Sequence, residues 1–126
     1  MTDELRGPFP TRVIPYANGE DLDASRAFYT DVLGFEVAME DPVLGLKSPA
    51  NGSAEVLVPP AGFHHPEPRF GIDLGEPEAV DAAHTAAVQR GLRIVYALRD
   101  EPWGVRRFFV EDPSGTIINV LAHTAA

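Results

Sequence analysis

Cysteine is absent from the 126 residues of this sequence. Disulfides, thiolate metal ligands and cysteine nucleophiles are therefore excluded. No apolar run approaches the roughly 20 residues that span a bilayer, and the N-terminal residues lack the pattern of a signal peptide. We therefore expect a cytoplasmic protein with no membrane partner.

Positive charge is also scarce. Nine arginines and one lysine stand against 19 acidic residues, and the formal net charge is -9. An acidic surface repels phosphate backbones, so we expect no nucleic-acid partner. The same charge favours cationic ligands, although solubility alone also accounts for it. Nucleophile elbows and phosphate-binding glycine loops are missing as well.

Hydrophobic periodicity and turn residues divide the chain into helices and strands. Apolar residues at helical spacing predict helices over 21–34 and 76–91, with Asp21 or Asp23 as the first N-cap and Gly34 and Gly91 as terminators. Short β-branched or alternating runs between turn residues predict eight strands, at 11–16, 35–40, 43–48, 54–59, 69–74, 92–99, 105–111 and 116–123.

The order of these elements is βαβββ twice, within one domain over residues 1–126. The first module covers about 8–60 and the second about 69–124, with a proline-rich joint at about 59–68. One helix can cover only one face of the four-stranded sheet in each module. We therefore predict an α+β fold whose two modules form a half-open barrel around a shared concave cavity.

The duplication leaves a trace in the sequence. "PANGSAEVL" (49–57) aligns with "PSGTIINVL" (113–121), which places Glu55 over Asn119. Strand alternation then puts Glu55 and Asn119 on the concave side. The intervening apolar residues should pack on the helices: Val56 and Val58 in module one, Ile118 and Val120 in module two.

Three segments together resemble the vicinal oxygen chelate superfamily: "SRAFYTDVLGFEV" (25–37), "PWGVRRFFVEDPSG" (102–115) and "TIINVLAH" (116–123). That family includes glyoxalase I, extradiol dioxygenases, fosfomycin-resistance transferases and bleomycin-resistance proteins. The resemblance covers essentially the whole chain, and it implies the same duplicated fold.

The resemblance also implies where a metal would bind. In metal-using members, the first and last strands of each module supply His, Gln or Glu to a divalent cation. The last-strand positions look like Glu55 and Asn119, and the first-strand positions fall within 11–14 and 69–71. These two windows contain no His, Glu or Gln, and Arg69 would repel a cation. We therefore expect no metal and no other cofactor.

This departure makes the chain resemble the metal-free bleomycin-resistance branch. Those proteins associate as homodimers and sequester planar, cationic ligands in clefts that aromatic and acidic side chains line. The resemblance thus implies a homodimeric protein that binds a small molecule, cationic or planar. The proline-rich joint allows the modules to pair within one chain or between chains.

Six residues are candidates for contacting the ligand: Glu55, Trp103, Arg106, Phe109, Asn119 and His123. A carboxylate inside a cavity requires a cation, an arginine or water. Trp103, in a Pro-Trp-Gly turn, could provide a rigid stacking face or anchor the turn. Phe108 and Phe109 point to opposite faces of one strand, and we favour Phe109 for the cavity.

The remaining candidates are polar. Arg106 and Arg107 also alternate, so one of them could pair with a ligand carboxylate or with Glu55, while a surface salt bridge is the commoner outcome. Asn119 offers hydrogen bonds without charge. His123 shares the predicted face of Asn119 and would need a partner to act as a base.

Two enzymatic hypotheses stand beside the binding protein. One is a lyase, isomerase or dioxygenase with an atypical metal site. That site would combine Glu55, Asn119 and His123 with His64 or His65. A solvated loop is the simpler interpretation of these two adjacent histidines. The other is metal-free acid/base chemistry with Glu55 and His123 in the same cavity.

Metal analysis separates these hypotheses. Protein purified without a histidine tag is expected to contain no stoichiometric divalent metal. A divalent-metal site needs about three anionic or imidazole donors, whereas this position offers one carboxylate and one amide. A divalent-cation thermal-shift panel should accordingly show no stabilisation. Stoichiometric metal that disappears in Glu55→Ala would contradict the metal-free hypothesis.

Overall fold

The structure is a computed structural model that describes residues 9–124. The described residues form two compact units, one from Ile14 to His65 and the other from Pro66 onward together with the residues up to Val13. The predicted start of module one at about residue 8 and both ends of the 1–126 domain lie outside the described residues. No helix in the described part of the chain is long and apolar enough to cross a membrane.

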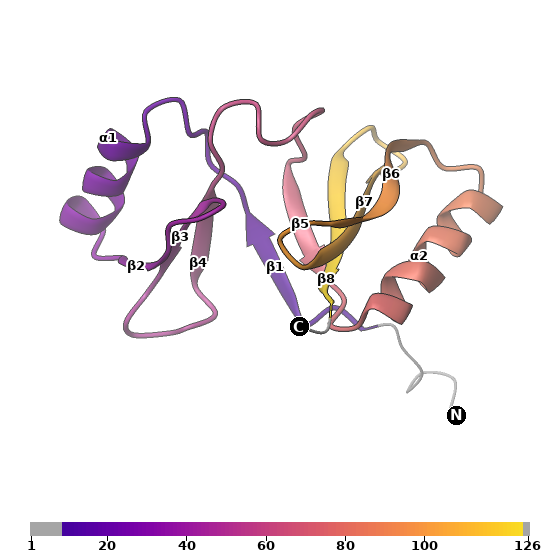
Figure 1. Cartoon of the computed structure of the whole chain (residues 1–126), viewed down its shortest axis with the longest axis horizontal. Coiled ribbons are helices and arrows are strands. Elements are labelled where there is room, and N and C mark those ends of the chain that lie inside the picture. Colours follow the sequence, from indigo (N-terminus) through magenta and orange to yellow (C-terminus); the bar gives the residue numbers. More distant parts are fainter. Residues whose placement is uncertain (1–8, 125–126) are drawn as a thin grey trace. The chain divides into compact units, whose positions relative to one another are not determined.

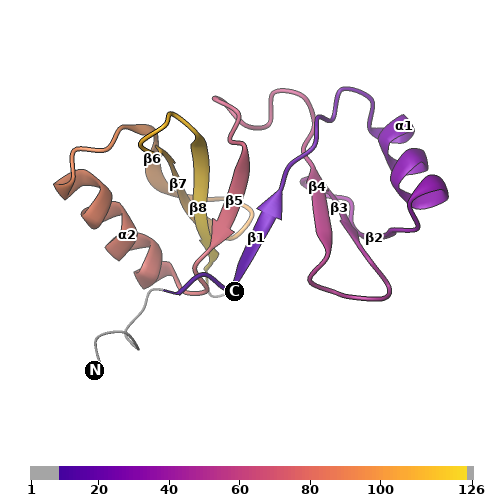
Figure 2. The same cartoon turned by 180° about the vertical axis from the view of Figure 1, so that it is seen from behind.

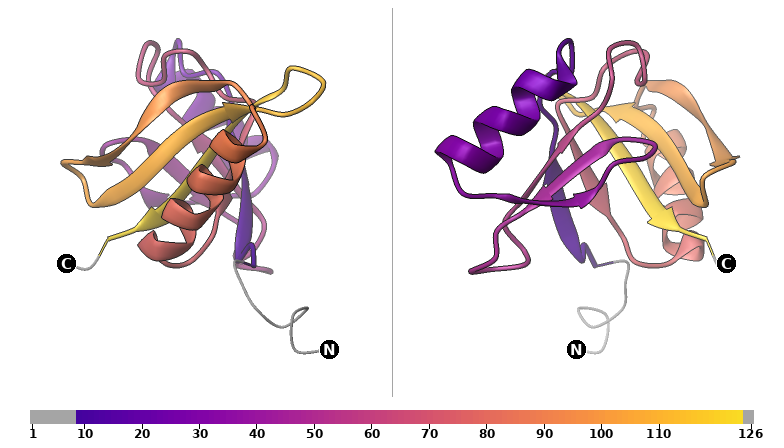
Figure 3. Two further views of the ribbon diagram at one scale, coloured as in Figure 1. Left: turned by 90° about the vertical axis from the view of Figure 1, so that its right-hand side faces the viewer. Right: turned by 60° about the vertical axis from the view of Figure 1, so that its left-hand side comes forward.

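A five-stranded sheet with strand order β1-β5-β8-β7-β6 belongs to the unit that begins at Pro66, except for the last two residues of β1 (Figure 1). Its elements are β1 (Arg12–Pro15), β5 (Phe70–Asp73), helix α2 (Pro77–Gln89), β6 (Ile94–Glu101), β7 (Val105–Glu111) and β8 (Ile117–His123). Strand β8 runs parallel to β5 and antiparallel to β7, and β6 and β7 form an antiparallel hairpin. Helix α2 lies along one face of this sheet (Figure 3, left).

The other unit contains a three-stranded antiparallel sheet with order β2-β3-β4, seen with its helix in Figure 2. Its elements are α1 (Leu22–Ala27), a π-helical continuation (Phe28–Val32), β2 (Glu36–Met39), β3 (Leu44–Lys47) and β4 (Glu55–Val58). The segment after β1 runs parallel to β4, with bridges from Tyr16 to Leu57 and from Gly19 to Pro60.

The predicted α+β fold and the repeated βαβββ order are confirmed. The expectation of four strands in each sheet is wrong, because β1 joins the sheet of the second module and leaves three strands in the first. Just before β1, the backbone N–H of Thr11 donates to the carbonyl of Asp73 at 2.7 Å. Alternation along a strand assigns its side chains to faces, but it does not indicate which neighbour pairs with its backbone.

Each helix covers an apolar sheet face, as strand alternation predicts. In the unit that contains α2, Ile118 and Val120 pack in one core cluster with Val80 of the helix. In the other unit, Val56 and Val58 pack in a cluster that includes Leu22 of α1. In each unit, therefore, the apolar face of the last strand of the module packs against the helix.

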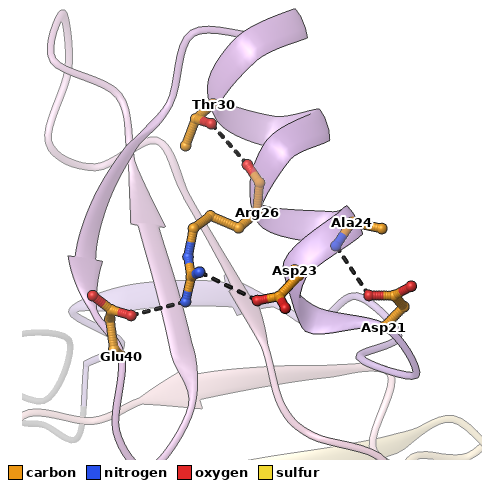
Figure 4. Close-up of polar contacts among 6 residues, drawn as sticks. All are labelled: Asp21, Asp23, Ala24, Arg26, Thr30 and Glu40. Atoms are coloured by element: carbon orange, nitrogen blue, oxygen red, sulfur yellow. Dashed lines mark hydrogen bonds and ion pairs between the residues drawn. The ribbon is translucent and has the colours of Figure 1, made fainter.

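Helix α1 begins at an acidic N-cap (Figure 4), and a π-helical segment follows it directly. The side chain of Asp21, not that of Asp23, accepts a hydrogen bond from Ala24 N at 3.0 Å. The hydroxyl of Thr30 donates to the carbonyl of Arg26 at 2.8 Å, where the helix becomes π-helical. The single helix predicted over 21–34 is therefore two consecutive helical segments, closed by Gly34 at a φ of 80°.

An aspartate organises the turn that precedes β8. One carboxylate oxygen of Asp112 accepts hydrogen bonds from Thr116 N at 2.9 Å and from Ser114 N at 2.8 Å. These bonds favour the ionised carboxyl group and hold the pKa of Asp112 below its usual value. The "DPSG" segment thus sets the entry of the chain into β8.

Gly19 is required by a close backbone approach in the unit from Ile14 to His65. A Cβ atom at this position would lie 2.0 Å from the carbonyl oxygen of Pro59. We expect Gly19→Ala to lower the free energy of unfolding by at least about 2 kcal/mol, measured by urea denaturation. Gly52→Ala is the matched control, because no atom lies within 4 Å of its added Cβ. Equal stability of the two variants would contradict this close approach.

Candidate functional site

The two faces of the five-stranded sheet have different chemistry. Phe108 belongs to the apolar core under α2, so its neighbour Phe109 lies on the opposite face of β7. In the pairing of β7 with β8, Phe109 is opposite Asn119 and Arg107 is opposite Leu121. Arg107, Phe109 and Asn119 therefore share the face that points away from α2.

Arg107 lies on this face inside a set of aromatic rings, although it is only 4% exposed. Its guanidinium carbon is 5.0 Å from the ring centroid of Tyr96, 5.1 Å from that of Trp103 and 5.0 Å from that of Phe109. The rings of Tyr96 and Phe109 stack on one another with centroids 4.5 Å apart. The negative ring faces stabilise a cation at these distances.

The charge of Arg107 is balanced by Glu101, which is also buried. Arg107 Nε donates to Glu101 Oε2 at 2.7 Å, and the Tyr96 hydroxyl donates to the same oxygen. Arg99 Nε lies 3.3 Å from the other oxygen, Oε1. We call this set the arginine cage: Arg107 with Glu101, Tyr96, Trp103 and Phe109.

The β6–β7 hairpin positions the arginine cage. Glu101 closes β6 and is paired with Val105, the first residue of β7. Gly104, at a φ of 87°, supplies the backbone conformation of the connecting turn, and its N–H donates to the carbonyl of Glu101 at 3.0 Å. Trp103 therefore sits at the hairpin tip, two residues beyond Glu101, with its ring beside Arg107.

A second ion pair lies at the opposite edge of the same sheet, where β1 and β5 are neighbours. Arg12 Nε is 2.9 Å from Asp73 Oδ2, and Gly75 N donates to Asp73 Oδ1 at 2.8 Å. Asp73 is buried, and in the pairing of β5 with β8 it is opposite Leu121. Among the described residues of this unit, the two buried carboxylates, Asp73 and Glu101, are thus held by arginines.

Five of the six predicted ligand residues belong to this unit and its sheet: Trp103, Arg106, Phe109, Asn119 and His123. Phe109 and Asn119 are cross-strand partners, and Asn119 is 3% exposed. Trp103 belongs to the arginine cage and keeps 37% of its surface exposed. His123 ends β8 opposite Val105 and is exposed, so its side chain is accessible to solvent.

Arg106 lies on the other face of the sheet from the arginine cage. It contacts Asp100 Oδ1 at 2.7 Å and Asp81 Oδ2, on α2, at 2.9 Å. The hydrogen bond from Arg106 lowers the pKa of Asp100. For Arg106 and Arg107, a surface salt bridge was the commoner expected outcome, and Arg106 forms one. A contact between Arg106 and a ligand stays a prediction.

Glu55 belongs to the other unit, where it is buried at the start of β4. Its proposed convergence with Asn119 stays a prediction. His64 is also buried there, with the rings of Tyr16 and Phe63 at centroid distances of 4.9 and 5.1 Å. The expected solvated loop is therefore wrong for His64, because two aromatic rings pack against it, whereas His65 is exposed.

Two members of this site, Tyr96 and Glu101, were not predicted from the sequence, and Arg107 was considered only as the alternative to Arg106. Alternation in "VRRFFVE" places Arg107 on the face of Phe109, so part of the signal was present. Tyr96 and Glu101 lie on a strand whose pairing with β7 has two register irregularities, one between Ile94 and Tyr96 and one between Tyr96 and Arg99. Simple alternation along that strand therefore does not predict which of its side chains meet Arg107.

Within residues 9–124, no three His, Asp or Glu side chains are placed to hold a metal ion together. Asp73 and Glu101 already bind guanidinium groups.

The sequence profile of the Glyoxalase/Bleomycin resistance protein/Dioxygenase superfamily matches residues 14–120. The chain belongs to this superfamily, which confirms the resemblance seen in its motifs. No curated protein matches the chain in sequence.

Solved structures share the fold. Methylmalonyl-CoA epimerase from Mycobacterium tuberculosis is similar with a TM-score of 0.73 and 19% identity, over 95% of this chain and 93% of that one. A superfamily member from Vibrio splendidus 12B01 has a TM-score of 0.62 and 22% identity, over 88% and 97%. An extradiol ring-cleaving dioxygenase from B. fuscum has a TM-score of 0.65 and 26% identity, over 94% of this chain but 34% of that one.

The buried pair of Arg107 and Glu101 should be critical for stability. We expect Glu101→Gln to lower the free energy of unfolding by about 3 kcal/mol or more, because it leaves a buried guanidinium without its carboxylate. The double variant Glu101→Gln, Arg107→Met should lose less than Glu101→Gln alone, as measured by urea denaturation.

Glu111→Gln is the control for this prediction. It breaks a pair with Arg93, whose side chain is 75% exposed, so it should cost about 1 kcal/mol at most. If Glu101→Gln cost no more than this control, the carboxylate would not be compensating Arg107.

Proposed function

We propose that this protein is a metal-free small-molecule-binding protein of its superfamily. The ligand would contact the face of the five-stranded sheet that points away from α2, beside the arginine cage. The observation that carries the proposal is the buried Arg107–Glu101 pair enclosed by three aromatic rings, one of which belongs to a partly exposed tryptophan.

The charges on this face support binding without a metal. Each buried carboxylate contacts an arginine, Asp73 with Arg12 and Glu101 with Arg107. A divalent cation would have to displace these guanidinium groups or lie beside them, and both arrangements cost electrostatic free energy. Asn119, on the same face, offers an amide that can donate and accept hydrogen bonds without adding charge.

Trp103 supports a planar ligand. Its ring lies 5.1 Å from the Arg107 guanidinium, which restrains the ring on one side, while part of its surface stays accessible. A restrained, accessible indole stacks on planar molecules at low conformational cost. The homodimer and the cytoplasmic location expected from the sequence stay predictions, and light scattering tests the first.

Ligand binding can be measured at Trp103 itself, because it is the single tryptophan of the chain. Its indole N–H gives one peak in the ¹⁵N–¹H spectrum, and we expect planar aromatic compounds to shift that peak. Trp103→Ala should weaken binding of the same compounds at least about fivefold, measured by calorimetry, because stacking contributes about 1 kcal/mol or more.

Phe28→Ala is the matched control, because Phe28 is a partly exposed aromatic residue of the other unit. This variant should bind like the wild type. Equal affinity of Trp103→Ala and the wild type would contradict the proposed site. Conversion of a bound compound into product would favour the enzymatic hypotheses.

A further inference from the structure

One helical segment of the unit from Ile14 to His65 has an exposed apolar face. Helix α1 and the π-helical segment that follows it cover residues 22–32, and neither contains a buried residue. Three large apolar residues at the end of this segment are exposed, Phe28 by 49%, Val32 by 66% and Leu33 by 54%. Single exposed apolar residues are common, whereas neighbouring ones mark a surface that binds another molecule. We call these three residues the helical patch.

The π-helical segment explains why Leu33 is exposed. Tyr29 packs against the core cluster of this unit, and in a regular α-helix Leu33, four residues later, would share its face. The i→i+5 hydrogen bonds of a π-helix widen the turn and move the following residues to another face. Phe28 then shares a face with the residues four and five positions later, which are Val32 and Leu33. A second amphipathic helix can cover such a row of apolar side chains.

The same segment of the chain is strongly acidic. Residues 20–41 contain seven acidic residues, all of them exposed, and one basic residue, Arg26. The guanidinium of Arg26 is already held by Asp23 Oδ1 at 3.4 Å and by Glu40 Oε1 at 2.8 Å (Figure 4). Seven negative charges and one positive charge give the segment a formal net charge of -6, out of -9 for the whole chain. Charge complementarity therefore favours a partner that carries positive charge.

We infer that the helical patch is a docking surface for a basic amphipathic helix of another protein. The partner's apolar stripe would cover the patch. Its Lys or Arg side chains would meet Asp31, inside the π-helical segment, and Glu36, at the start of β2. This inference goes beyond the proposed function and does not depend on ligand binding at Trp103.

The charge of this segment opposes other occupants. In an isologous dimer the same surface of two copies meets, so one segment of charge -6 would face another. Like charges placed against one another weaken an interface. Nucleic acids and anionic membrane surfaces carry the same sign of charge and are repelled as well. A basic protein segment is therefore the occupant that fits both the apolar patch and the acidic residues near it.

Three dye-labelled peptides of about 18 residues, long enough for about five helical turns, test the inference by fluorescence anisotropy. The basic peptide has leucine on one helical face and lysine elsewhere. The acidic peptide has glutamate in place of lysine, and the scrambled peptide has the composition of the basic one with its leucines spread around the helix. We expect the basic peptide to bind at least about tenfold more tightly than the scrambled one, because only its leucines can be buried together on the patch. The acidic peptide should not bind.

Variants of the patch locate the binding surface. The double variant Val32→Ser, Leu33→Ser should weaken binding of the basic peptide at least about tenfold, because it removes two apolar side chains that the peptide would cover. Its urea midpoint should stay close to that of the wild type, since both side chains are exposed. Val88→Ser is the control, because Val88 is 53% exposed on α2, in the other unit, and it should leave the affinity unchanged.

Variants of the carboxylates test the charge. Asp31→Asn combined with Glu36→Gln should weaken binding of the basic peptide roughly threefold and reduce its dependence on salt, since each exposed ion pair contributes little. Glu67→Gln combined with Glu78→Gln is the matched control, because it removes two exposed carboxylates of the other unit. This control should change the affinity less.

Several results would overturn the inference. They are failure of the basic peptide to bind, equal affinities for the basic and scrambled peptides, and equal losses in the patch variant and in Val88→Ser. Light scattering of the protein alone tests a second copy as the occupant. A dimer that dissociates in Val32→Ser, Leu33→Ser would show that a second copy covers the patch, and it would overturn the inference as well.

Discussion

The guanidinium of Arg107 is removed from water, and its charge has to be compensated within the fold. Glu101 supplies the opposite charge at 2.7 Å, and three aromatic rings supply their negative faces. This arrangement constrains the hairpin from which it is built, because Glu101 ends one strand and Arg107 lies near the start of the next. The register of β6 against β7, the tight turn at Gly104 and the position of Trp103 all serve the same ion pair.

The two faces of this sheet carry different kinds of side chain, and the difference follows from this ion pair. Toward α2 the strands present an apolar surface that includes Phe108, Val110 and Val120, and burial of this surface holds the helix on the sheet. Away from α2 the same strands present Arg107, Phe109 and Asn119. A side-chain period of two lets one sequence serve both purposes, because neighbouring residues never compete for the same environment. The residues of the two faces can thus differ independently.

Superfamily membership leaves the chemistry of the site open, because one fold supports many activities. The relatives of similar structure include an epimerase and a ring-cleaving dioxygenase. In this chain, arginines bind the two buried carboxylates of the sheet that contains the arginine cage. A carboxylate that binds guanidinium acts as a structural counterion, whereas a metal centre needs several carboxylates or imidazoles with a shared opening. The two buried carboxylates of this sheet are thus engaged by arginines.

The sequence by itself determined the order of the elements and the opposite orientations of Phe108 and Phe109, and it narrowed the first N-cap to Asp21 or Asp23. These properties are local, since they depend on periodicity, on turn residues and on the alternation of one strand. Only the tertiary structure decided that β1 joins the second sheet and that Tyr96 and Glu101 meet Arg107. Strand pairing and contacts between strands depend on register, and the irregularities in β6 shift that register in a way that no pattern along a single strand reveals.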